Sequence, residues 1–186
     1  MTEKEKALAG LEFVRGDKDL KSQRENAEML CFELNRTSPT DTEKREEIFN
    51  TLIKDTKEGC YIKSPFICEY GAYISLGRNF FANYNCKLLD GGKITFGDDV
   101  LIGPDCTFVT AVHPVEPERR LAGYQIFKSI LVGNNVWFGA GVLVCPGVTI
   151  GDNCVIGAGS VVVKDIPANC VAVGNPCRVI RKVTDS

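Results

Sequence analysis

The sequence is poor in histidine, has little net charge and lacks any long apolar run. Its 186 residues include one histidine, which excludes a metal site built on two or more imidazoles of one chain. A formal net charge of −2 argues against the basic surface that nucleic-acid binding requires. No segment offers about 18 apolar residues for a membrane span, and the first residues resemble no secretory or transit signal. We therefore expect a cytoplasmic protein with no nucleic-acid or membrane partner.

The nine cysteines form no C-x-x-C pair, and their odd number resists a complete disulfide framework within one chain. In a reducing compartment they are interpreted as free thiols. A zinc or redox motif is not predicted, and we expect no metal cofactor.

Residues 1–58 differ from the rest in charge and in hydrophobic spacing. They hold 25 of the 46 charged residues. Apolar residues at helical spacing predict one helix from Asp17 to Asn35, and Thr37-Ser38-Pro39 ends it. Thr40 to Glu43 has capping-box spacing and predicts the start of a second helix. The segment 1–58 is therefore predicted to be a small helical cap that packs against the main body.

Residues 59–186 carry a six-residue repeat. An apolar residue recurs at twelve positions, with a two-residue slip at Gly91-Gly92 and one long interruption: Leu76, Ala82, Leu88, Phe96, Ile102, Phe108, Val132, Phe138, Val144, Ile150, Ile156 and Val162. Four residues later comes a second inward candidate, as at Phe80, Cys86, Val100, Cys106, Val136, Val142, Val148, Cys154 and Ser160.

Glycine follows the repeated apolar residue in seven cases, as expected at corners where a Cβ would crowd the backbone or where φ is positive. A period of six with frequent Val, Ile and Phe predicts a prism-like parallel β-helix, in which short strands form the faces. The class is mainly β, with the β-helix over 59–186.

The repeat is interrupted between Phe108 and Val132, which lie 24 positions apart, so that the register is kept. Two prolines and four charges between Thr110 and Arg120 cannot line a solenoid interior. We expect an extruded loop at about 109–130, and a long insertion in a regular array is more often functional than accidental.

Several stretches together resemble the hexapeptide-repeat acetyltransferases, in the maltose/galactoside O-acetyltransferase branch. They are Gly77 to Asn85, Thr110 to Pro114, Gly133 to Gly139, Pro146 to Asn153, Val155 to Ser160, Lys164 to Pro167 and Gly174 to Arg181. The resemblance implies a left-handed β-helix, a homotrimer with clefts between subunits, and transfer of an acetyl group from acetyl-CoA to a hydroxyl of a sugar or similar small acceptor.

His113 matches the catalytic histidine of that family, and an imidazole can take the proton of an acceptor hydroxyl near neutral pH. Asn83 matches a position credited with stabilising the oxyanion or binding the acceptor. Asn85, two residues on, is predicted to lie on the same strand face. Asp90 falls near a carboxylate that binds acceptor hydroxyls, although the glycine slip leaves its alignment open.

Two departures from the family bear on the acceptor. Gln125 stands where many relatives have a glutamate that helps to position the histidine, and Glu69 stands where some have Asp or Ser. An amide can still bond an imidazole but cannot stabilise its charged form.

The resemblance also implies a coenzyme A site, with Arg178, Arg181 and Lys164 supplying charge for phosphates. Ala140, Ala158 and Val163 are implied to line it. Trp137 offers a stacking face, but the period directs it outward, where it could equally cover a subunit contact.

Other functions stay open on the sequence alone. A non-catalytic solenoid module and a xenobiotic or amino-sugar acetyltransferase of the same fold are the alternatives, whereas a carbonic anhydrase would need three His ligands at each metal. A two-step route through a cysteine is disfavoured, because Cys86, Cys106 and Cys154 occupy inward positions of the repeat.

Overall fold

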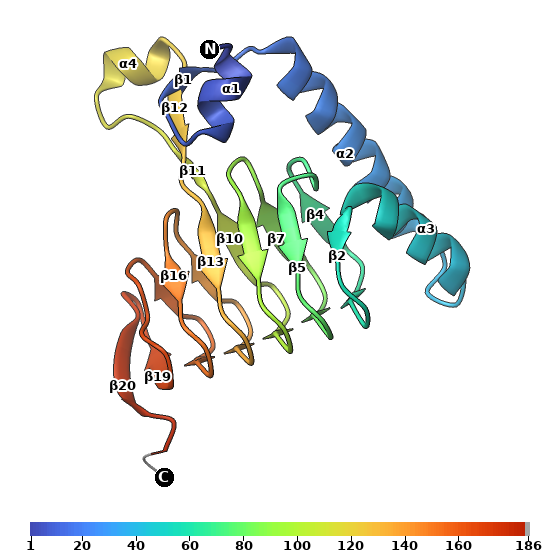
Figure 1. The fold of residues 1–186 in the computed structure, drawn as a ribbon, viewed down its shortest axis with the longest axis vertical. Coiled ribbons are helices and arrows are strands. Elements are labelled where there is room, and N and C mark those ends of the chain that lie inside the picture. The colour runs from blue at the N-terminus through green and yellow to red at the C-terminus, as the bar shows by residue number, and fades with distance from the viewer. Residues whose placement is uncertain (185–186) are drawn as a thin grey trace.

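The computed structural model describes residues 1–184 and is a prism of stacked coils, with two long helices at one end and two short ones beside the coils (Figure 1). Three parallel sheets form its faces. The first face contains β2 (Asp55–Thr56), β5 (Ile74–Leu76), β8 (Ile94–Phe96), β13 (Ile130–Val132) and β16 (Thr149–Ile150). The second contains β3 (Tyr61–Ile62), β6 (Phe81–Ala82), β9 (Leu101–Ile102), β14 (Trp137–Phe138), β17 (Val155–Ile156) and β19 (Cys170–Val173), followed by the antiparallel β20 (Arg178–Lys182). The third contains β4 (Phe66–Cys68), β7 (Cys86–Leu89), β10 (Thr107–Val109), β15 (Leu143–Val144) and β18 (Val161–Val162).

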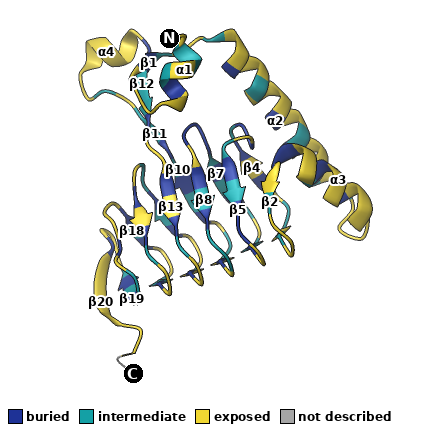
Figure 2. Ribbon diagram, viewed as in Figure 1, coloured by how far each residue is buried: buried dark blue, intermediate teal, exposed yellow. Residues whose placement is uncertain are grey.

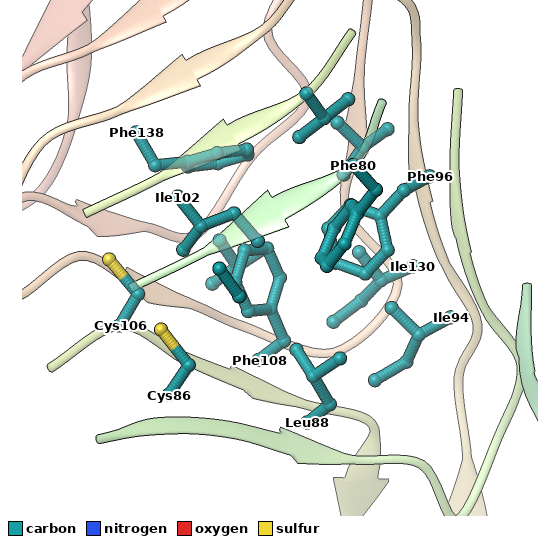
Figure 3. Close-up of a cluster of buried hydrophobic side chains, with 14 of the residues drawn as sticks. Phe80, Cys86, Leu88, Ile94, Phe96, Ile102, Cys106, Phe108, Ile130 and Phe138 are labelled. Atoms are coloured by element: carbon teal, nitrogen blue, oxygen red, sulfur yellow. The ribbon is translucent and has the colours of Figure 1, made fainter. Parts of the chain in front are cut away.

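The interior of the prism confirms the six-residue repeat. All twelve repeated apolar residues and all nine second inward candidates are buried. Four of them form a stack of rings through successive coils, with centroids 4.9 Å apart for Phe80 and Phe96, 5.1 Å for Phe96 and Phe108, and 5.2 Å for Phe108 and Phe138 (Figure 3). Cys86 and Cys106 fill the same interior as small residues. The coils therefore share one continuous apolar core.

The seven repeat glycines are explained by crowding, because none of them has a positive φ. A Cβ on Gly77 would lie 2.3 Å from the backbone carbon of Gly97 in the next coil. The left-handed corner conformation is instead adopted by seven Asn and Asp residues, which tolerate it, and by glycines outside the repeat position, such as Gly141 and Gly159. Of the two reasons expected for these glycines, only close approach of neighbouring coils applies.

Three edges join the faces. The ladder edge, between the first and second faces, carries Asn79, Asp99, Asn135, Asn153 and Asn169, all at positive φ. The Gly-Ala-Gly edge, between the second and third faces, carries residues 139–141 and 157–159. The loop edge lies between the third face and the first.

The loop edge is the irregular one. Buried residues of successive faces lie six positions apart across the other two edges. Across the loop edge Leu76 comes eight positions after Cys68, and Phe96 comes eight after Leu88. Val132 follows Phe108 after 24 positions and still occupies the next face, as the repeat predicted.

Three helices form the cap: α1 (Glu3–Leu8), α2 (Lys18–Arg36) and α3 (Thr42–Leu52). Helix α2 covers the first coil, where the Asn35 amide exchanges two 2.8 Å hydrogen bonds with the backbone of Phe66. Three details differ from expectation. The first solenoid strand begins at Asp55, before the predicted boundary; Asp41, not Thr40, caps α3; and the sequence interpretation missed α1, although Thr2 and Glu5 form a capping box.

The extruded loop is ordered. It forms an antiparallel hairpin of β11 (Ala111–Val112) and β12 (Tyr124–Phe127), with the exposed helix α4 (Pro117–Leu121) at its tip (Figure 2). Strand β1 (Phe13–Val14) pairs with the outer side of β12. The N-terminal segment thus contacts the loop as well as the solenoid. No helix within residues 1–184 is long and apolar enough to cross a membrane.

Candidate active site

The residues predicted for the site fall into two groups, one on each side of the third face. Glu69, Asp90, His113, Gln125, Val163 and Lys164 lie at the loop edge or on the loop that leaves it. Asn83, Asn85, Ala140 and Ala158 lie at the Gly-Ala-Gly edge. The extended strand β7 lies between Asn83 and Asp90, and its four residues span on the order of 13 Å. One subunit therefore keeps its two groups of candidate residues apart.

His113 and Gln125 both lie on the extruded loop, near the end of its hairpin. Val112 pairs with Ile126, and strand β11 ends at Val112. His113 therefore lies one position beyond the last pair of the hairpin, and Gln125 lies next to Ile126 on β12. His113 is exposed. Gln125 pairs with Phe13 of β1, and its contact with His113 stays a prediction.

Asp90 is fully buried, and its carboxylate bonds backbone rather than facing a cleft. Oδ1 accepts the N–H of Glu69 at 2.9 Å and of Tyr70 at 2.8 Å, and Oδ2 accepts that of Tyr73 at 3.2 Å. Burial raises the pKa of Asp90 to about 6, against the opposing effect of these bonds. Its visible role is to hold the turn after β4, so a direct contact with an acceptor hydroxyl would require that turn to open.

Glu69 lies on the turn that Asp90 holds. Partial burial raises its pKa, the Asp90 charge raises it further, and Arg24 acts in the opposite direction. The backbone of Glu69 is held to the solenoid by its N–H bond to Asp90, at the same edge from which the His113 loop departs.

Asn83 and Asn85 flank Tyr84 in a corner rather than on a strand, so the expectation of a shared strand face was wrong. The Asn83 Oδ1 accepts the Tyr84 N–H at 2.9 Å. Asn85 has φ 61° and donates from Nδ2 to Asp105 at 2.6 Å in the next coil. Asn85 thus stabilises the corner, whereas the only bond of the Asn83 side chain within residues 1–184 is the one to the next residue.

The Gly-Ala-Gly edge has room for an extended ligand. Nothing lies within 4 Å of a Cβ built on Gly141 or Gly159. Arg178 and Arg181 lie on β20, which folds back antiparallel on β19, so the C-terminal positive charge is held on the solenoid. These residues fit a pantetheine arm and its phosphates. Val163 and Lys164 lie at the opposite edge, at the end of β18.

Trp137 points outward, with 55% of its surface exposed, as the period predicted. It belongs to a row on the second face formed by the outward residues of successive strands: Tyr61, Phe81, Leu101, Trp137, Val155 and Val171. The corresponding row of the first face is mostly polar: Asp55, Ser75, Thr95, Leu131 and Thr149. We call the apolar row the outer stripe.

One feature of the loop escaped the sequence interpretation. The Phe127 ring lies against Gly91, where a Cβ would come within 2.4 Å of it, and packs on Phe13 with a centroid distance of 4.9 Å. The slip at Gly91-Gly92 was the available signal, because it marks a place where another element comes close to the backbone.

Metal chemistry needs a set of ligand side chains close together, and thiol chemistry needs a reactive cysteine. Within residues 1–184 no group of three or more His, Cys, Asp or Glu side chains could hold a metal ion. Burial raises the pKa of the Cys86 thiol to about 12 and also raises the pKa values of Cys106 and Cys154. Such thiols are poor nucleophiles.

Comparison with known proteins defines the class. Residues 129–164 match the bacterial transferase hexapeptide family, and residues 6–57 match the maltose acetyltransferase hexapeptide capping motif. A galactoside acetyltransferase solved in complex with coenzyme A has a TM-score of 0.95 and 43% identity, covering 100% of this chain and 92% of its own. Its likeness and the hexapeptide match establish the fold as a left-handed parallel β-helix.

Two further relatives place the chain within that class. The galactoside O-acetyltransferase of Escherichia coli K12 is 44% identical over 181 residues, which cover 97% of this chain and 89% of the relative. A maltose O-acetyltransferase structure from Clostridium difficile 630 has a TM-score of 0.91 and 46% identity, covering 98% of this chain and 97% of its own. The chain belongs to the hexapeptide-repeat acetyltransferases, in the maltose and galactoside O-acetyltransferase branch.

Proposed function

We propose that the protein transfers an acetyl group from acetyl-CoA directly to a hydroxyl of a sugar or similar small acceptor, in clefts between the subunits of a homotrimer. The observation that supports a shared cleft is the separation of His113 from Asn83. The two side chains lie on opposite sides of the third face. Groups that act on one reacting centre must approach it to about 3 Å.

His113 acts as the general base. Acetyl-CoA supplies an activated acyl group in its thioester. The His113 imidazole takes the proton of the acceptor hydroxyl, so that the oxygen can attack the carbonyl, and returns it to the departing thiolate. Gln125, on the other strand of the same hairpin, orients the imidazole through its amide. No residue is acylated in this route.

Asn83 stabilises the developing negative charge on the carbonyl oxygen. Its side-chain oxygen is bound to the Tyr84 N–H, and the amide N–H groups are the donors that an oxyanion needs. The opening along Gly141 and Gly159 supports an extended cofactor beside Asn83. Arg178 and Arg181 then bind its phosphates, while Val163 and Lys164 complete the cleft from the neighbouring subunit.

The outer stripe is the surface that supports a trimer. Its central members Leu101 and Trp137 are 50% and 55% exposed in the single chain. A continuous apolar row of this kind marks a protein interface in a soluble protein. Three identical heterologous contacts close into a ring, which places the Gly-Ala-Gly edge of one subunit beside its neighbour.

A subunit-mixing experiment tests the shared cleft. We expect His113→Ala and Asn83→Ala each to lower kcat/KM, the first by roughly 10²–10⁴, without loss of thermal stability. Co-expressed with different tags and purified through both, the two variants form mixed trimers. Each mixed trimer has one cleft with both native residues, so activity returns to about a third of wild type.

The outcomes separate the parts of the proposal. An active His113→Ala enzyme would refute the general base, and a trapped acetyl-enzyme would refute direct transfer. Mixed trimers without activity would show that both residues act from one subunit. Release of the CoA thiol with maltose, glucose, galactosides and amino-sugar compounds identifies the acceptor class.

A further inference from the structure

The neck of the His113 loop is closed by a buried threonine. Thr110 is fully buried at the loop edge, three residues before His113. Its backbone oxygen accepts the N–H of Lys128 at 2.8 Å, which joins the two ends of the loop. The hairpin then continues through Ala111 with Phe127 and Val112 with Ile126. His113 follows directly after this short stem.

The Thr110 hydroxyl fixes the neck to the coil beneath it. Oγ1 donates to the Leu89 backbone oxygen at 2.8 Å and accepts the Gly92 N–H at 2.8 Å. The Thr110 N–H also bonds the Leu89 oxygen, at 3.3 Å. The hydroxyl therefore bonds the N–H of Gly92, in the glycine pair against which Phe127 packs, and the backbone oxygen of Leu89, just before that pair.

Thr110 repeats, one coil later, what Asp90 does. Each follows the buried third-face residue, Leu88 or Phe108, by two positions. Each uses a buried side chain to bond the backbone of the preceding coil at the loop edge. The bonds of Asp90 hold the turn that contains Glu69, and the bonds of Thr110 hold the start of the extruded loop.

We infer that Thr110 is a positioning residue for the transfer reaction, whose hydroxyl sets the direction in which the hairpin leaves the solenoid and thereby places His113. The inference rests on the proposed role of His113. A buried hydroxyl with both a donor and an acceptor role fixes direction better than an apolar contact, because each bond constrains distance and angle. Loss of these bonds allows the stem to shift, and a displacement of about 1 Å at a catalytic group can cost up to 10²-fold in rate.

The test uses two substitutions at one position. Thr110→Val keeps the shape and removes the hydroxyl, whereas Thr110→Ser keeps the hydroxyl. We expect Thr110→Val to lower kcat by about 10-fold or more with KM for acetyl-CoA changed less than about twofold. Thr110→Ser should restore kcat to within about threefold of wild type. Hydrogen exchange of residues 111–127 should accelerate in Thr110→Val only.

A core variant separates positioning from general destabilisation. Val100→Ala removes buried volume at the ladder edge and should lower Tm without changing kcat or exchange in the loop. Unchanged loop exchange in Thr110→Val, or a loss of kcat no larger than in Val100→Ala, would overturn the inference. Faster loop exchange with unchanged kcat also overturns it. A fully active His113→Ala enzyme would refute the proposed role of His113. That result is obtained without any Thr110 variant, so the two failures can be told apart.

Discussion

The ladder edge and the loop edge differ in the regularity of the repeat and in where their polar side chains lie. At the ladder edge left-handed Asn and Asp residues of neighbouring coils bond one another, as in Asn79 to Asp99 at 2.8 Å and Asn153 to Asn169 at 2.9 Å. These side chains stack at the surface, and the step between faces is always six residues. The loop edge carries the extra residues and buries its polar groups instead.

The difference indicates a division between stability and function. A solenoid gains stability from identical contacts between neighbouring coils, so a regular edge contributes to it at every step. An insertion costs little in loop-closure entropy when its ends already meet in the array. The loop edge can therefore carry His113 while the ladder edge keeps the coils in register.

The largest expected effect on stability comes from a glycine of the ladder edge. Gly77→Ala places a Cβ 2.3 Å from the Gly97 backbone, which cannot move without disturbing the stack. We expect a loss of about 3 kcal/mol or more in unfolding free energy. Gly141→Ala is the matched control, since it meets open space at φ 69° and should cost about 1–2 kcal/mol of backbone strain. Denaturant unfolding at one protein concentration measures both, and equal losses would contradict the close-approach explanation.

The repeat made most of the fold predictable, because burial by stacking demands an apolar residue at every sixth position. Leu88 and Phe108 illustrate this directly, since both are fully buried. The loop could be located only as a loss of period. The folded form of the loop includes the contact of Phe127 with Phe13, more than 100 positions away. A contact between residues so distant in the sequence leaves no local pattern in it.

Most site residues were predicted from the resemblance, and Asn85 from its two-residue spacing to Asn83. The structure changed the interpretation of Asp90 and of Asn85. Asp90 bonds three backbone N–H groups, and Asn85 sits in a left-handed corner. Neither fact follows from residue type, because an Asp or Asn serves a corner or a ligand equally well. The hydrogen-bond partners decide between these roles.

A smaller effect is expected from Asp90 at the loop edge, and it depends on pH. Because burial raises the folded-state pKa from 3.8 to about 6, the stability linked to this group is fully present below pH 3.8 and is lost as pH rises through about 6. Asp90→Asn does not titrate, so its loss of stability relative to wild type should shrink between pH 4.5 and 7. Unfolding free energies across this range test the sign. A difference that grows with pH would show that the carboxylate, with its three N–H donors, is the form that the fold prefers.

The smallest expected effect is at an exposed corner of the ladder edge. Asn135 has φ 52° and donates to Asn153 at 3.0 Å. Asn135→Ala loses that bond and places an alanine in a left-handed corner, for about 1–2 kcal/mol, whereas Asn135→Gly loses only the bond and should cost less. Thermal unfolding of both variants, with activity as a second readout, separates backbone conformation from the ladder bond. Equal losses would assign the stability of this edge to its side-chain hydrogen bonds, and a fall in kcat would contradict the division between a stabilising edge and a catalytic one.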